Sequence, residues 1–290
     1  MAVTNKLALL VGCNYTNNHK VPVENKLHGC INDVNAVQAL IRQRFGFQDK
    51  NITILTEETE MKPTSYNIMY QLKSLIDAAK PGDTLLFYFS GGGAVVKHTV
   101  KNKITDIPAI VPSDLHPITV DFILPKLNLL PDGAFFTFIC DSSYSGGLFH
   151  NEVQIESNVR DPGSNFRRKT IPSNLLQSHN VFENLAAGIS LNNKFLFSSS
   201  KANEESVEVY PNGDESKAIS AFSNAIQTLL NSPQAVNPSV AGNHLNALYN
   251  IWEVAAYTKA VLGILGFDQH PYVNYGDNTA AASFLGGYVA

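Results

Sequence analysis

The sequence predicts an α/β protein with a mostly parallel central sheet and helices on both faces. Continuous apolar runs are typical of strands buried on both faces of a parallel sheet. Helical patterns separate most of these runs, and such alternation favours parallel strands joined by helical crossovers. The predicted strands cover residues 6–13, 51–56, 84–90, 134–140 and 194–200.

Four segments have the apolar periodicity of amphipathic helices. Residues 30–46 carry one apolar stripe and end at Gly46, a residue suited to a helix C-terminus. A second helix is expected within 65–82, which closes with Pro and Gly. Two more are expected at 215–232 and 243–263. All four are long enough to cover a sheet.

The chain divides into three parts by composition. Residues 1–150 form a large portion, 151–193 a polar linker rich in Pro, Gly and Ser, and 194–290 a smaller portion that completes the same domain. We expect the linker to be exposed and its charged residues solvated, with proteolytic processing as the alternative role. Its basic cluster consists of Arg167, Arg168 and Lys169.

Composition excludes several classes of function. The net charge of -4 gives no electrostatic basis for binding nucleic acid. No apolar run approaches the ~20 residues that cross a bilayer, and the N-terminal run is expected to be a buried strand rather than a signal peptide. The three cysteines have neither a disulfide framework nor a zinc-site spacing. A cytoplasmic protein with reduced thiols is expected.

Several motifs resemble those of one protease family. They read "ALLVGCNY" at 8–15, "LHGCINDV" at 27–34, "FYFSGGG" at 87–93, "CDSSYSGGL" at 140–148 and "LGFDQHPYVN" at 265–274. In these segments the chain resembles the metacaspases, caspase-like cysteine proteases of peptidase clan CD, and is most similar to the plant type II branch. The resemblance implies a caspase-like fold and a monomer.

The resemblance also locates the family's Cys–His dyad. Active members have histidine where this chain has Gly92, cysteine where it has Ser143, and a second histidine where it has Tyr144. A serine hydroxyl is not ionised near neutral pH and needs a base, whereas glycine has no side chain to supply one. We therefore expect no ordinary peptidase activity.

Other side chains near the two loops offer different chemistry. His98 and His150 follow the dyad positions and are the candidates for a substitute base. Cys140 ends a predicted strand and is expected to be a buried small hydrophobe. Backbone amides of residues 143–147 are candidates for an oxyanion hole, although a turn of small residues explains the same sequence.

The resemblance further implies a pocket for a basic side chain. In the family, residues matching Asp33, Ser90 and Asp141 bind the Arg or Lys that precedes the cleaved bond. Two carboxylates in one pocket suit a guanidinium or an ammonium group. The alternative is structural: Asp33 packs or caps near its helix start, and Asp141 accepts hydrogen bonds in a turn.

Calcium activation, a property of active type II members, is not expected. Calcium needs several carboxylate or carbonyl oxygens. The corresponding loop at 94–108 has a single acid, Asp106, among three lysines, Lys97, Lys101 and Lys103. No metal site and no cofactor are predicted.

The sequence thus predicts a pseudoprotease that binds a peptide or protein partner bearing a basic residue. The alternative is a repurposed enzyme that acts on a small molecule in the cleft through Ser143, Tyr144 and His98, with Asp141 and Cys140 as further candidates. A purely structural or storage role is the third possibility. Neither nucleic acid nor a membrane is expected as a partner.

Overall fold

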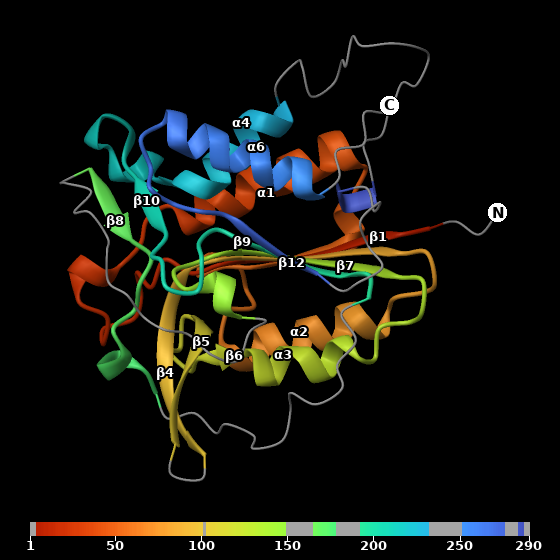
Figure 1. The fold of residues 1–290 in the computed structure, drawn as a ribbon, viewed down its shortest axis with the longest axis horizontal. Coiled ribbons are helices and arrows are strands. Elements are labelled where there is room, and N and C mark those ends of the chain that lie inside the picture. The colour runs from red at the N-terminus through yellow and green to blue at the C-terminus, as the bar shows by residue number, and fades with distance from the viewer. Residues whose placement is uncertain are drawn as a thin grey trace.

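The fold is built on a six-stranded sheet in the order β12-β9-β7-β3-β1-β2 (Figure 1). The computed structural model describes residues 4–100, 103–148, 165–177, 192–231, 251–275 and 284–286. Five strands are parallel, and β12 runs antiparallel to β9 at one edge. The strands are β1 (Lys6–Gly12), β2 (Ile52–Leu55), β3 (Thr84–Ser90), β7 (Phe135–Asp141), β9 (Lys194–Ser198) and β12 (Tyr272–Tyr275).

Helices cover both faces of this sheet, as the sequence predicts (Figure 1). On one face lie α1 (Cys30–Phe45), α4 (Ala221–Asn231) and α6 (Ile251–Ile264). The other face carries α2 (Ser65–Asp77) and α3 (Val120–Leu127). Gly46 ends α1 in the left-handed region, at φ 72°, where a side chain would be strained. The predicted helix end at this glycine is confirmed.

Alternate residues of the central strands fill the two halves of the core. Phe87 and Phe138 point toward α2 and α3 and stack with their ring centroids 4.4 Å apart. Tyr88 and Phe197 lie on the opposite face, in the cluster that includes α1 and α4. Burial on both faces explains why these strands appear in the sequence as continuous apolar runs.

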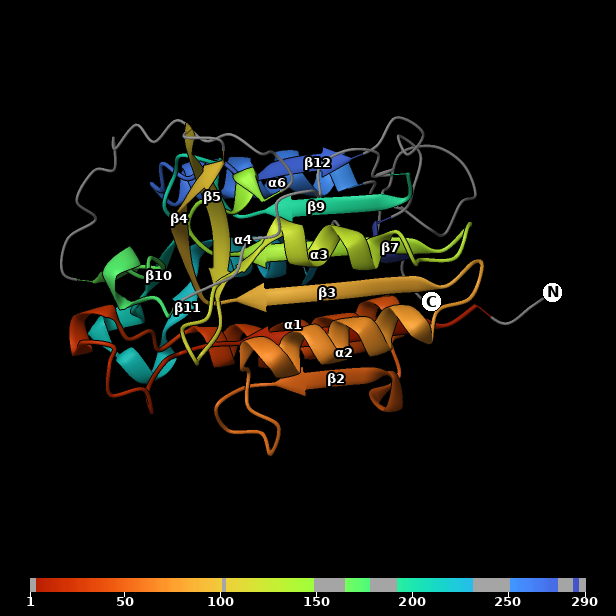
Figure 2. The ribbon, with the colours of Figure 1, turned by 90° about the horizontal axis from the view of Figure 1, so that it is seen from below.

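The register brings the carboxyl ends of the central strands to one edge. Gly12 pairs with Ser90, and Ser90 pairs with Asp141, so β1, β3 and β7 end at the same level. Figure 2 shows the smaller strands gathered at this end of the sheet. In open α/β sheets this edge is where functional groups collect.

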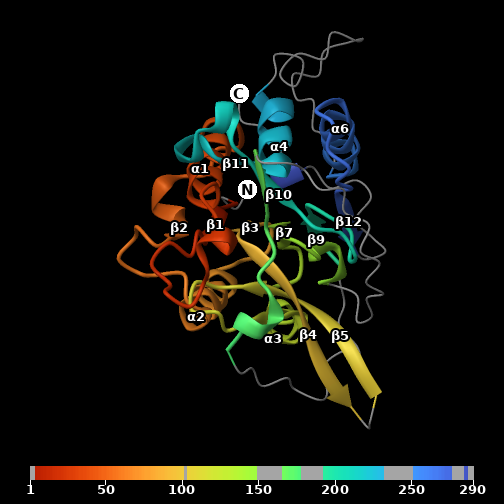
Figure 3. The same ribbon diagram turned by 90° about the vertical axis from the view of Figure 1, so that its left-hand side faces the viewer.

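Two small antiparallel sheets stand at this edge. The first contains a long hairpin that projects from the body of the molecule (Figure 3). The hairpin consists of β4 (Gly92–Val100) and β5 (Lys103–Val111), and the short β6 (Ile118–Thr119) is the third strand of this sheet. The second sheet contains β8 (Phe166–Arg168), β10 (Val207–Val209) and β11 (Ile219–Ser220).

Some segments differ from the sequence prediction. The expected loop at 94–108 is the β4–β5 hairpin, whose β-branched residues favour strands. The helix predicted from 215 begins only at Ala221, because Ile219 and Ser220 pair with β10. Residues 243–250 of the last predicted helix lie outside the described residues.

The described part of the predicted linker, residues 165–177, belongs to the folded body. It contributes β8 to the second small sheet, and within it Lys169 and Ile171 are buried, contrary to the expectation of an exposed segment. In the described ranges we find no helix with the length and apolar character that a membrane span requires.

The stacked pair gives a test of the core. Replacing Phe138 with Ala is expected to lower the free energy of unfolding by about 3–5 kcal/mol, because it opens a cavity between the sheet and the α2–α3 layer. The matched control is Leu129→Ala, since Leu129 is 61% exposed and its loss is expected to change stability by under about 0.5 kcal/mol. Urea unfolding measures both, and equal effects would contradict this assignment of the core.

Candidate functional site

Three polar side chains from distant parts of the chain meet at the carboxyl edge of the sheet. Ser90 and Asp141 end β3 and β7, and α1 places Asp33 in its first turn. Ser90 Oγ donates to Asp33 Oδ2 over 2.7 Å. All three residues are fully buried. The structure therefore brings together the residues expected to form the basic-side-chain pocket.

Further donors hold the two carboxylates in place. Asp33 Oδ1 accepts from the amide of Ser220 over 2.9 Å. Asp141 accepts from Ser223 Oγ over 2.6 Å and from Ser206 Oγ over 3.2 Å. Each carboxylate keeps a lone pair for a cation, since these donors occupy only part of its capacity.

The cation in this pocket is Lys169, from the chain's own linker. Its Nζ donates to Ser90 Oγ at 2.7 Å and lies 3.1 Å from Asp141 Oδ1 and 3.5 Å from Asp33 Oδ2. The Lys169 side chain is 0% exposed. The prediction that the basic cluster is solvated is thus wrong for this residue, because burial beside two carboxylates compensates for its lost hydration.

Burial and charge set the protonation of the pocket. Burial and, less strongly, the nearby Asp141 raise the pKa of Asp33 to about 7, against the opposing effect of Lys169. Burial by itself lowers the pKa of Lys169, but the surrounding acidic groups, Asp141 first, outweigh it and raise this pKa. Lys169 is therefore an ammonium group throughout the neutral range.

The backbone around Lys169 lies at the carboxyl edge of the central sheet as an extended segment, residues 166–171, which we call the strap; the site beneath it is called the cleft. β8 pairs antiparallel with β10, and the amide of Lys169 continues this ladder to the carbonyl of Ser206 over 2.8 Å. Beyond Lys169, the amide of Ile171 donates to the carbonyl of Gly93 over 2.9 Å. The strap thus binds between the two small sheets as an added strand.

Two amides converge on the carbonyl oxygen of Lys169. The amide of Gly93 donates to it over 2.8 Å and that of Ser143 over 3.3 Å. A Cβ at position 93 would lie 1.9 Å from the carbonyl oxygen of Ser143, so only glycine allows this close approach. Paired amide donors are the geometry of an oxyanion hole. The amide of Ser143 is one of the donors predicted at 143–147, and their role as an oxyanion hole stays a prediction.

The Ser143 hydroxyl is enclosed by the strap and by Ser206, the residue before β10. Its Oγ accepts from the amide of Ser206 and from Thr170 Oγ1, both over 2.9 Å. Its remaining contact is with the carbonyl of Ser206, at 3.5 Å. Ser143 is only 1% exposed. In the described part of the chain, none of its hydrogen-bond partners is a histidine.

Tyr144 points away from Ser143 toward an acid. It adopts the left-handed conformation at φ 62°, and its hydroxyl donates to Glu205 Oε1 over 3.4 Å. Thr170 Oγ1 lies 3.0 Å from the same oxygen. Burial, followed by the charge of Glu205, raises the pKa of Tyr144 to about 12. Tyr144 is therefore a neutral hydroxyl that helps to hold the strap.

Ile171 fills the space beside Gly92. A Cβ built on Gly92 would lie 2.4 Å from Cγ1 of Ile171 and 3.0 Å from the hydroxyl of Tyr15. That hydroxyl accepts from the amide of Gly92 over 2.7 Å and donates to the carbonyl of Val111. The position therefore has no room for a larger residue while the strap is in place.

The remaining candidates are remote from this centre, outside the described residues, or buried in the core. His98 is in β4, six residues beyond Gly92, which corresponds to roughly 20 Å along a strand. His150 lies outside the described residues. Cys140 is fully buried, and burial raises the pKa of its thiol, as expected for a small hydrophobe at a strand end.

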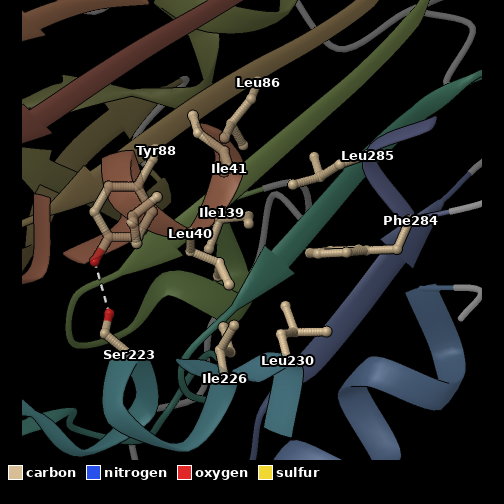
Figure 4. Close-up of a pocket in the computed structure, with 11 residues that line it drawn as sticks. Leu40, Ile41, Leu86, Tyr88, Ile139, Ser223, Ile226, Leu230, Phe284 and Leu285 are labelled. Atoms are coloured by element: carbon tan, nitrogen blue, oxygen red, sulfur yellow. Dashed lines mark hydrogen bonds between the residues drawn. The ribbon is translucent and has the colours of Figure 1, made fainter. Parts of the chain in front are cut away.

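One enclosed gap lies under the site, between the sheet, α1 and α4 (Figure 4). Its volume is about 10 Å³, at the lower limit for a single water molecule. Apart from Tyr88 and Ser223, whose hydroxyls bond to each other over 2.6 Å, the side chains around it are apolar. It has no room for a ligand.

Sequence reasoning missed Lys169 as the occupant of the pocket, and it also missed Thr170, Ile171 and Glu205. The available signal was charge complementarity: the linker has three consecutive basic residues, and two acids were expected to share one pocket. Nothing in the local pattern joins residue 169 to residues 33 and 141.

Comparison with known proteins agrees with this architecture. The sequence model of the metacaspase peptidase C14 domain matches residues 6–151. Metacaspase-9 of Arabidopsis thaliana is 35% identical over 98% of this chain and 97% of its own length. Metacaspase-7 of the same plant is 40% identical, over 49% of this chain and 35% of that protein.

Two solved structures share the fold. The protein GSU0716 from Geobacter sulfurreducens superimposes with a TM-score of 0.61 at 15% identity, over 96% of each chain. Caspase-1 from Spodoptera frugiperda gives a TM-score of 0.53 at 11% identity, over 94% of this chain and 87% of its own. The fold is thus caspase-like, and the chain belongs to the metacaspase family of caspase-like proteases.

The protonation of Asp33 predicts a pH dependence. With a folded pKa of about 7 and an unfolded pKa near 3.9, the folded state holds one more proton between these values. This group's contribution to stability therefore falls as pH rises through 7. Between pH 5.5 and 8 the loss is expected to be about 1–2 kcal/mol, and Asp33→Asn is expected to remove it. Urea unfolding of both proteins tests this, and parallel pH profiles would contradict it.

Proposed function

We propose that this metacaspase homologue does not hydrolyse peptides and acts by binding a segment of a partner protein in the cleft that its own strap occupies. One observation carries the proposal. The strap places Lys169 in the basic-side-chain pocket, its carbonyl on two amides, and Ile171 beside Gly92. The cleft thus holds a peptide in an extended, hydrogen-bonded form.

The chemistry at the two dyad positions supports the absence of hydrolysis. Gly92 supplies no base, and the Ser143 hydroxyl needs one to become a nucleophile. Loss of core members of a catalytic unit typically lowers kcat by about 10⁶, or ~8 kcal/mol of barrier. Of the two candidate bases, His98 is the one that the structure describes, and its backbone position is remote from Ser143.

Calcium activation is not part of the proposed function. The hairpin at 94–108 has one acid, Asp106, and its Oδ1 already lies 3.3 Å from Nζ of Lys97. A cation pairing with the only local carboxylate opposes the binding of a dication. We also propose that the protein is a cytoplasmic monomer.

The small-molecule alternative receives no support. It requires an open cleft in which Ser143, Tyr144 and His98 face one ligand. Instead, the strap covers Ser143, Tyr144 turns toward Glu205, and His98 lies along the hairpin. Binding of an extended protein segment uses the arrangement as it stands.

A cleavage assay tests the proposal. Peptides containing Arg or Lys are incubated with the unaltered chain and with Lys169→Ala, each with and without calcium. We expect no turnover in any sample, and binding of the Lys peptides to Lys169→Ala, whose pocket has lost its internal occupant. Turnover that Ser143→Ala abolishes would contradict the absence of activity. Absence of binding to a folded Lys169→Ala chain would contradict the binding role.

The packing of Ile171 gives a second test. Gly92→His is expected to displace the strap, because the new side chain and Ile171 need the same space. The rate of cleavage after Lys169 by added endoproteinase Lys-C is expected to increase tenfold or more. Mass spectrometry measures this rate. Gly92→Ala is the smaller matched change, and its added Cβ also meets Ile171. In the double variant Gly92→Ala/Ile171→Ala this contact is removed, and only a small increase in the cleavage rate is expected. Strap protection unchanged by Gly92→His would contradict this packing.

A further inference from the structure

The strap inserts a second basic side chain into the body of the protein. Because β8 is extended, Arg167 and Lys169 point to the same side, and Arg168 points to the other. Arg168 remains exposed and pairs with Glu205, Nε to Oε2 over 3.1 Å. Arg167 is instead enclosed, with 19% of its side chain exposed. Arg167 and Lys169 are therefore enclosed by the protein, whereas Arg168 between them stays exposed.

The Arg167 pocket presents acceptors to both terminal nitrogens of the guanidinium group. One terminal nitrogen donates to the carbonyls of Val23, over 3.2 Å, and Lys26, and contacts Nε2 of His28 at 3.0 Å. The other lies 3.7 Å from Oε1 of Glu215.

An aromatic ring completes this pocket. The guanidinium carbon of Arg167 lies 5.7 Å from the ring centroid of Tyr210, a cation–π distance. Arginine suits such a site better than lysine does, since its planar group stacks on a ring and donates in several directions at once.

The walls of the pocket are held by a buried acid outside the strap. Glu208 is fully buried and accepts from the amides of His28 and Gly29, over 3.1 Å and 2.8 Å. It also accepts from the hydroxyl of Tyr210 over 2.8 Å. These bonds join the turn before α1 to β10 without any strap residue. The pocket is therefore built by the body of the protein.

We infer that the cleft recognises two basic side chains at once, and that the partner segment which displaces the strap has the pattern Arg-X-Lys in an extended conformation. This inference rests on the proposed function and specifies its ligand. The pocket of Asp33, Ser90 and Asp141 takes the lysine. The pocket of Val23, Lys26, His28, Tyr210 and Glu215 takes the arginine two residues earlier. The residue between them contributes little.

The strap itself provides the first test, in the full chain. Opening of the strap is measured as cleavage after Lys169 by endoproteinase Lys-C, whose rate follows the population of the open form when reclosing is fast. Arg167→Ala is expected to accelerate this cleavage tenfold or more, since it removes several hydrogen bonds to a charged group. The matched control Arg168→Ala loses a single ion pair of a guanidinium that is 42% exposed, and a change within about threefold is expected.

Two outcomes decide this first test. Cleavage after Lys194, in the buried strand β9, reports global unfolding and is expected to stay unchanged in both variants. Equal acceleration by Arg167→Ala and Arg168→Ala would overturn the inference. An increase at Lys194 that matches the increase at Lys169 would overturn it as well, because the arginine would then support the fold rather than the strap.

A second test uses a ligand in trans. A labelled Phe-Arg-Arg-Lys-Thr-Ile peptide is titrated into Lys169→Ala, with anisotropy as the readout. Alanine at the peptide's first arginine is expected to weaken binding tenfold or more, and alanine at the second to change it within about threefold. Equal effects would overturn the two-pocket inference alone. If the parent peptide fails to bind the folded variant, the proposed function fails with it.

Discussion

The cleft depends on one buried ion cluster, the ammonium group of Lys169 between the carboxylates of Asp33 and Asp141. Removing two carboxylates from water is costly unless a cation compensates for them, and removing one partner of such a cluster typically costs about 3–5 kcal/mol. The three charges come from α1, β7 and the strap. Their meeting therefore joins two elements of the large portion to the segment that follows it.

Around that cluster, the strap fills the cleft and pairs with its backbone hydrogen-bonding groups, as a bound peptide would. Its backbone extends one small sheet, its carbonyl receives two amides, and Ile171 fills the gap beside Gly92. Main-chain hydrogen bonds supply much of such binding, and the side-chain pockets supply its selectivity. The alternation of Arg167, Arg168 and Lys169 along the strap follows from the period of two in a strand.

The sequence was sufficient for the fold class because buried parallel strands and amphipathic helices leave strong local patterns. The runs at 84–90 and 134–140 correspond closely to β3 and β7, and Gly46 ends α1. The convergence of Asp33, Ser90 and Asp141 followed from the family motifs. The position of Lys169 did not follow from them, because no local pattern links it to Asp33 or Asp141, and a basic run in a polar segment usually remains in water. The β4–β5 hairpin was missed because lysines interrupt its apolar pattern.

The burial of Lys169 in solution is the most direct test of the account. Reductive methylation of the native protein, followed by peptide mass spectrometry, measures the reactivity of each lysine. We expect Lys169 to remain unmodified while Lys201 and Lys217, whose side chains are 53% and 69% exposed, react readily. Methylation of Lys169 at the rate of these two residues, in protein that is still folded, would contradict a cleft closed by its own strap.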